Sequence, residues 1–240
     1  MLYPEAEWHP VKNFGYPQGT HGQLAANGPR GSFWHDAQGW KAGAEATFNT
    51  PGRGGAHIII NLDGPPWQFI DLDDAAWHCG GYIPGTGAFA NLFYWGIEFE
   101  GGYPKPHFIT EHQLAEAVKL HLWLARHYPI AWKFERRVDL WEHRDVYNTS
   151  CPNDRILWPE AIARLKGEDT MTDADRAWVI RYSGGIKLIK GSPATVYVVD
   201  HRGKRPFPGG PTQFTQVGFD WDDVIRLPDT VIAAIPDAQL

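Results

Sequence analysis

The chain has 240 residues, a formal net charge of -6 and 43% hydrophobic residues, enough to form one ordinary domain and a small second one. The negative charge argues against nucleic acid as a partner, because affinity for a phosphate backbone depends on a basic surface. Apolar runs such as Ile58-Ile59-Ile60 are far shorter than the roughly 20 residues needed to cross a bilayer, so we expect no membrane insertion.

The amino-terminal segment and the cysteines indicate in which cellular compartment the chain is made. The segment has neither a basic start nor an apolar core, so it does not have the pattern of a secretory signal, and we expect synthesis in the cytoplasm without a signal peptide. Cys79 and Cys151 are the two cysteines, and a single disulfide is not the expected framework for an unsecreted chain of this size. Each thiol therefore needs its own explanation.

The first predicted elements surround a hairpin. Residues 1–30 are rich in Gly, Pro and Asn without a steady period, which predicts an irregular arm, and a short strand ends at His35. The segment Ala56–Leu62 alternates with period two and is predicted to be a strand, and Asp63-Gly64 supplies the turn to a second strand over Trp67–Leu72.

Helices enter further along the chain. A largely buried strand is predicted over Phe93–Glu100 and another over Val138–Glu142. Thr110 and Gln113 match a capping box, and apolar residues at helical spacing continue that helix to near Arg126. A shorter helix is predicted over Trp158–Leu165.

This pattern predicts two domains. Residues 1–170 are expected to form an α/β domain with a mixed central β-sheet flanked by helices, and residues 171–240 a small β-rich domain. The boundary is placed at the polar, acidic segment Lys166–Asp175, after which the pattern changes to short strands and turns.

Eleven histidines are candidates for metal binding or catalysis, and most are set aside. His112 and His127 lie at the ends of the predicted helix, and His121 lies on its apolar stripe, where a core histidine is commoner than a ligand. Four others lie in loops without a partner motif. The remaining candidates are His35, His57, His78 and His143.

His143 and Cys151 are close in sequence, and Zn²⁺ accepts both imidazole and thiolate ligands. A catalytic zinc site has three protein ligands and one open position, so this pair would be two-thirds of a site. The spacing alone is weak evidence, since a structural cysteine near a surface histidine is the commoner cause. Because the His-Glu-x-x-His motif is absent, a third ligand would have to come from a distant strand.

Five ordered segments together carry more information than this pair. They are His35 at a strand end, Gly55–Ile60 with Asp63-Gly64, Ala76–Gly81, Gly96–Gly101, and His143 to Cys151-Pro152. In this order, over about residues 30–165, the chain resembles the superfamily of N-acetylmuramoyl-L-alanine amidases and peptidoglycan recognition proteins, and within it phage endolysins.

The resemblance implies a zinc site and a general base. It makes His35, His143 and Cys151 the Zn²⁺ ligands and Glu98 the catalytic carboxylate, which would take a proton from water and deliver one to the leaving amine. A strand carboxylate paired with a basic residue is the structural alternative for Glu98. Glu100 has the same strand parity and ranks behind it.

Three further residues are expected to bind substrate: His57, His78 and Thr149. The two histidines could hydrogen-bond the substrate carbonyl or the oxyanion, although a structural hydrogen bond is an equal alternative for His57. Two departures are visible, because several relatives have Tyr at the position of Ala56 and Lys at that of Thr149. Cys79 is interpreted as a buried thiol.

The implied function is that of a phage endolysin-like N-acetylmuramoyl-L-alanine amidase. It would use Zn²⁺ to hydrolyse the amide bond between the lactyl group and L-alanine in its partner, the peptidoglycan of the bacterial cell wall. The alternatives are a non-catalytic peptidoglycan-binding module or a virion-associated wall-binding protein that keeps the fold. Five aromatic residues in the carboxy-terminal part could stack on sugars or fill a small core: Tyr197, Phe207, Phe214, Phe219 and Trp221.

Overall fold

The computed structural model divides the chain into two units, Met1–Gly167 and Glu168–Leu240. In the first unit it describes residues 1–102 and 108–167. In the second it describes residues 187–190, 196–200, 203–206, 224–226, 232–233, 235 and 237. Each unit is considered by itself.

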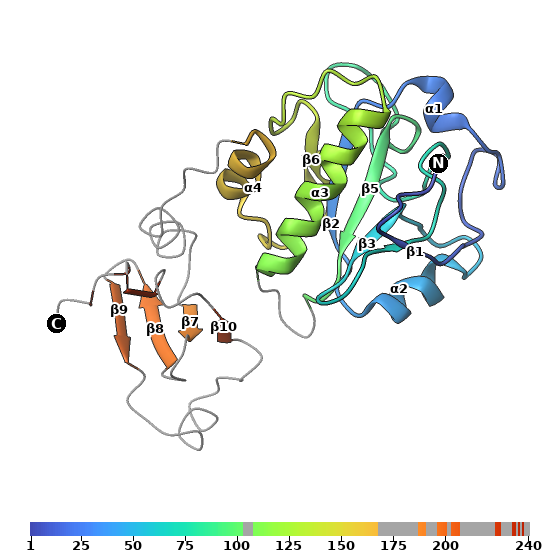
Figure 1. The fold of residues 1–240 in the computed structure, drawn as a ribbon. Coiled ribbons are helices and arrows are strands. Elements are labelled where there is room, and N and C mark those ends of the chain that lie inside the picture. Colours follow the sequence, from blue (N-terminus) through green and yellow to red (C-terminus); the bar gives the residue numbers. More distant parts are fainter. Residues whose placement is uncertain are drawn as a thin grey trace. The chain divides into compact units, whose positions relative to one another are not determined.

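The first unit is built on a six-stranded mixed sheet with the strand order β1-β4-β3-β5-β2-β6 (Figure 1). Neighbouring strands are parallel except β3 and β4, which form the hairpin predicted at Asp63-Gly64. The strands are β1 (Glu7–Trp8), β2 (Gly31–Asp36), β3 (Ile58–Ile60), β4 (Trp67–Gln68), β5 (Tyr94–Phe99) and β6 (Leu140–Glu142). The predicted mixed central sheet is therefore observed.

Helices and short helical turns connect and cover these strands. They are α1 (Gln23–Asn27), α2 (Lys41–Phe48), α3 (Glu111–His127) and α4 (Trp158–Leu165), with the 3-10 turns η1 (Ala90–Leu92) and η2 (His143–Asp145). Among the described residues, no helix combines the length and apolar character that a membrane span requires.

One face of the sheet packs against α3, which lies across the strands in Figure 1. Alternate residues of β2, β3 and β5 point to this face, as period-two alternation requires. The buried cluster between sheet and helices includes Trp34, Ile58, Ile60, Trp95, Ile97, Phe99, Leu114, Ala117, Leu120 and Leu124. The opposite face of β2 and β5 is consequently free to carry Phe33, His35, Gly96 and Glu98.

The longest helix follows its local signals. Thr110 accepts a hydrogen bond from the Gln113 backbone N–H, and the Gln113 side chain accepts one from the Thr110 N–H, so the predicted capping box is confirmed. His121 is a core histidine, as expected, because its Nδ1 donates to the Ala117 carbonyl at 2.7 Å and its Nε2 lies 2.7 Å from the Ser32 hydroxyl. Helix α4 has the predicted bounds.

Among the strands and α-helices of the first unit, three were not predicted, namely β1, α1 and α2. Strand β1 and helix α1 lie within the arm expected to be irregular, so that expectation is corrected for these two segments. Helix α2 has no side-chain cap of its own. Its first backbone N–H, from Lys41, instead donates to Oε1 of Glu100 at 2.9 Å. Because this partner is distant in sequence, no local pattern indicates where α2 begins.

The second unit contains a four-stranded sheet with the order β10-β7-β8-β9. Its strands are β7 (Lys187–Lys190), β8 (Val196–Asp200), β9 (Gly203–Pro206) and β10 (Val224–Arg226). Among the described residues of this unit, Val199, Ile232 and Ile235 are buried. Of the aromatic residues considered for stacking on sugars, Phe207, Phe214, Phe219 and Trp221 lie outside the described residues.

Candidate metal centre

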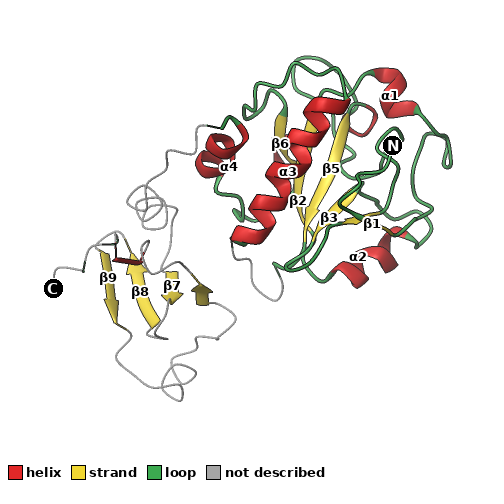
Figure 2. Cartoon of the chain, in the orientation of Figure 1, coloured by secondary structure: helices red, strands yellow, loops and turns green. Residues whose placement is uncertain are grey.

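The candidate site lies where the carboxyl ends of β2, β5 and β6 meet. These strands are parallel and adjacent, so their carboxyl ends reach the same edge of the sheet (Figure 2). His35 is the penultimate residue of β2 and pairs in register with Glu98 of β5. His143 directly follows β6. Strand geometry alone therefore brings three of the predicted site residues to one edge.

His35, His143 and Cys151 come together there as a trio. One potential ligand atom from each residue lies within 4.8 Å of the others, and Cys151 Sγ is 3.8 Å from His35 Nδ1. Sulfur and nitrogen ligands of a tetrahedral zinc ion, at metal distances of roughly 2.3 and 2.0 Å, are about 3.5 Å apart. The spacing of the trio therefore fits this donor set.

The protonation states of the trio are also suited to binding a cation. Burial lowers the pKa of His35 and His143, so both imidazoles are neutral at pH 7, the form that binds a metal. Burial, followed by the charge of Glu98, raises the pKa of the Cys151 thiol well above its ordinary value. A thiol in these surroundings becomes a thiolate when a cation compensates its charge. The backbone N–H of Asp36 already donates to Cys151 Sγ at 3.2 Å.

Glu98 is the titratable carboxyl beside the trio. Burial and, to a smaller extent, the nearby Asp36 carboxylate raise its pKa to about 8, against the opposing effect of the Arg155 guanidinium. Its Oε2 is buried and, among the described residues, has no hydrogen-bond partner. A buried oxygen without a hydrogen bond destabilises a fold unless a ligand or a water molecule donates one to it. The Glu98 carboxyl is therefore a candidate for catalysis.

Glu100 has a different role. Its Oε1 accepts the hydrogen bond from the Lys41 N–H that caps α2, and its Oε2 accepts one from the Leu62 N–H at 2.8 Å. The side chain is buried, so both oxygens serve the fold. Glu100 is therefore engaged in the fold, and the choice of Glu98 as the base stays a prediction.

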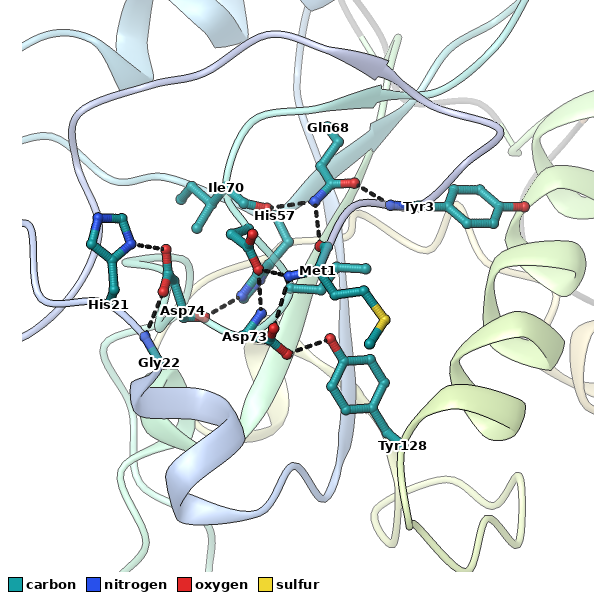
Figure 3. Close-up of polar contacts among 12 residues, drawn as sticks. Met1, Tyr3, His21, Gly22, His57, Gln68, Ile70, Asp73, Asp74 and Tyr128 are labelled. Carbon is teal, nitrogen blue, oxygen red and sulfur yellow. Dashed lines mark hydrogen bonds and ion pairs between the residues drawn. The ribbon is translucent and has the colours of Figure 1, made fainter.

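His57 does not reach a surface open to substrate. The side chain is fully buried, its Nε2 donates to the Asp74 carbonyl at 2.9 Å, and its Nδ1 accepts from the Gly96 N–H at 3.0 Å (Figure 3 shows the first bond). Both ring nitrogens are therefore occupied by the backbone. These bonds fit the structural alternative for His57, and its contact with substrate stays a prediction.

His78 and Thr149 lie next to the trio but bond to the protein itself. His78 is 7% exposed, and its ring nitrogens bond to His35 and to the Tyr94 carbonyl, which does not fit the predicted place in a groove. The hydroxyl of Thr149 accepts a hydrogen bond from the Cys151 N–H at 3.2 Å. Thr149 thus shapes the turn that presents the thiol, and its contact with substrate stays a prediction.

Comparisons with known proteins identify the family of the chain. A family model described as N-acetylmuramoyl-L-alanine amidase matches residues 25–154, more than half of the chain. The chain belongs to the N-acetylmuramoyl-L-alanine amidase family. The resemblance seen in the sequence is confirmed, and this amidase is a hydrolase by family.

Solved structures show the same fold for the amidase. A selenomethionine derivative of AmpD is similar at 20% identity with a TM-score of 0.53, covering 70% of this chain and 97% of that chain. A mutant of PlyL is similar at 16% identity with a TM-score of 0.51, covering 68% of this chain and 98% of that chain. The search of curated proteins finds no match. At these identities the likeness shows the fold alone, and it confirms the predicted α/β architecture.

Sequence reasoning missed a buried ion pair behind the candidate metal centre of the amidase. Arg155 Nη1 donates to Asp36 Oδ1 at 2.6 Å, and both side chains are fully buried. Arg155 also donates to the carbonyls of Phe99 and Glu100, and Asn153 donates to Asp36 Oδ2 at 2.7 Å. The one available signal was an acidic residue directly after His35 and a basic residue shortly after Cys151.

We expect the Asp36→Asn variant to unfold far more readily than the wild-type amidase. The substitution keeps the shape of the side chain but removes the charge that neutralises a buried guanidinium, and breaking such a pair costs about 3–5 kcal/mol. Urea unfolding of the metal-free protein measures this loss. Arg137→Ala is the control, because Arg137 is 71% exposed in its ion pair with Asp145 and such pairs contribute less than about 1 kcal/mol. Equal losses in the two variants would contradict the assigned role of the buried pair.

Proposed function

We propose that this chain is a zinc-dependent N-acetylmuramoyl-L-alanine amidase of the phage endolysin type. It would hydrolyse the amide bond between the lactyl group of N-acetylmuramic acid and the L-alanine of the stem peptide in bacterial peptidoglycan. The observation that carries the proposal is the trio His35, His143 and Cys151 beside the buried Oε2 of Glu98.

The trio would hold Zn²⁺ through two imidazoles and one thiolate, which leaves one position open, as in catalytic zinc sites. A bound zinc ion would polarise the scissile carbonyl and lower the pKa of a water molecule to about 7. The buried surroundings supplied by the fold strengthen these electrostatic effects, because little water screens them.

Glu98 would move the protons. A cation held by the trio favours the carboxylate form of its neighbour, so the raised pKa of Glu98 would fall when the site is loaded. Glu98 Oε2 would then accept a proton from the attacking water and deliver it to the nitrogen of the leaving L-alanine. One carboxyl can serve in both steps because the second transfer restores its first state.

The first test is metal content and its link to activity. We expect about one Zn²⁺ per chain, and we expect His143→Ala and Cys151→Ala to lose both metal and hydrolysis, because a catalytic zinc has three protein ligands. Elemental analysis measures the first, and mass spectrometry of fragments released from purified cell walls, with and without a chelator, measures the second.

His112→Ala is the matched control, since this histidine bonds the Gly64 carbonyl and lies outside the trio. Full hydrolysis by a metal-free protein would refute the zinc mechanism. Wall binding without released fragments would favour the non-catalytic binding module instead.

The second test concerns the base. Glu98→Gln keeps the shape of the side chain but removes the proton acceptor, so hydrolysis should fall by at least about 100-fold, the scale of general acid-base catalysis. Zinc content should stay at the wild-type level. Glu100→Gln is the comparison in which a loss of folding stability is expected, because Glu100 caps α2. Unchanged kcat in Glu98→Gln would exclude it as the base.

We also propose that residues 171–240 form a separate module that assists binding to the wall. Every proposed ligand precedes residue 152, and the first unit ends at Gly167. A chain truncated after Gly167 should fold, bind Zn²⁺ and hydrolyse small soluble muropeptides, yet lose activity on intact walls. An insoluble or metal-free product would show that the second part is needed for folding, and undiminished lysis would refute the wall-binding role.

A further inference from the structure

Two consecutive residues, His78 and Cys79, contact both histidines of the trio. His35 Nε2 lies 3.0 Å from His78 Nδ1, and His78 Nε2 lies 3.1 Å from the Tyr94 carbonyl oxygen. His143 Nε2 lies 2.9 Å from the carbonyl oxygen of Cys79. One dipeptide therefore touches the same ring nitrogen of both proposed ligands.

These contacts define which nitrogen carries each proton. The Tyr94 carbonyl can only accept, so Nε2 of the neutral His78 ring is the donor and its Nδ1 is an acceptor. His35 must then donate from Nε2, which leaves the lone pair of its Nδ1 on the side of Cys151 Sγ, 3.8 Å away. The Cys79 carbonyl likewise requires His143 to donate from Nε2.

We propose that His78-Cys79 is a positioning dipeptide that presents both histidine ligands to the metal through Nδ1. The assignment rests on the proposed zinc amidase function and deepens it. His78 acts through His35, so it is a positioning residue and not a substrate-binding one. Groups that hydrogen-bond the second nitrogen of a metal-bound histidine determine its tautomer and its orientation.

The positioning dipeptide is itself held firmly. The side-chain oxygen of Asn91 accepts hydrogen bonds from the N–H groups of Cys79, at 2.9 Å, and Gly80, at 3.4 Å. A Cβ at Gly96 would lie 2.5 Å from Cβ and Cγ of His78, so the imidazole can lie against β5 because residue 96 has no side chain. The place of His78 is thus set by the backbone of β5 and by an anchored loop.

Zinc affinity of the full chain tests the role of His78, measured by competition with a chromophoric chelator. His78→Leu should bind Zn²⁺ about 10- to 100-fold more weakly, the usual effect of losing such a partner. His78→Asn should recover much of this loss, because its Oδ1 can accept a hydrogen bond near the position of the imidazole Nδ1. His121→Gln is the matched control, because His121 is also a buried histidine but lies on α3, and this variant should keep wild-type affinity.

The tautomers test the role of both residues without any substitution. Long-range ¹H–¹⁵N spectra of the zinc-loaded, histidine-labelled protein should show protons on Nε2 and metal on Nδ1 for His35 and His143. Coordination of either histidine through Nε2 would overturn the assignment, as would equal zinc affinity of wild type and His78→Leu. A wild-type chain that binds no Zn²⁺ would refute the proposed function itself, and the assignment with it.

Discussion

The arrangement of the candidate metal centre depends on the buried ion pair between Asp36 and Arg155. Taking both charges out of water costs several kcal/mol per ion, so the pair persists only while its hydrogen bonds are complete. These bonds come from three segments far apart in sequence, namely the end of β2, the end of β5 and the turn after Cys151. Moving any one segment would leave a buried charge without its partner in apolar surroundings. Because Asp36 directly follows His35 and Arg155 lies shortly after Cys151, the pair holds these two residues close together.

Because side chains alternate between the two faces of a strand, the candidate site residues and the core residues lie on opposite faces of the sheet. In β2, Trp34 belongs to the core beneath α3, whereas Phe33 and His35 point to the other face, and β5 divides its residues in the same way. The sheet can therefore bury a continuous apolar layer on one side while it presents His35 and Glu98 in register on the other. Folding itself orders these groups, so no further loss of conformational entropy is needed to assemble them, and the site is preorganised.

The sequence predicts what local signals determine. Helix α3 has its own capping box and β5 its own apolar run, so both could be located, whereas α2 obtains its cap from Glu100 and could not. Ordered motifs identified the residues of the trio, but only the sheet order shows that they meet. Period-two alternation gives the face on which His57 lies, yet it does not show that neighbouring backbone covers that face and occupies both ring nitrogens.

The surroundings of Ala56 and Thr149 leave Glu98 as the group proposed for the proton chemistry. These are the two positions at which the sequence resemblance leads one to expect Tyr and Lys. Ala56 is fully buried in an apolar cluster, and the hydroxyl of Thr149 accepts a hydrogen bond from the Cys151 N–H. Neither offers a free acid or base. With its pKa raised to about 8, Glu98 is mostly protonated at pH 7, and in the proposed mechanism it would become a base when a cation in the trio favours its charged form. The same electrostatic interaction would thus create the nucleophile and the group that activates it, so that catalysis is coupled to occupancy of the metal site.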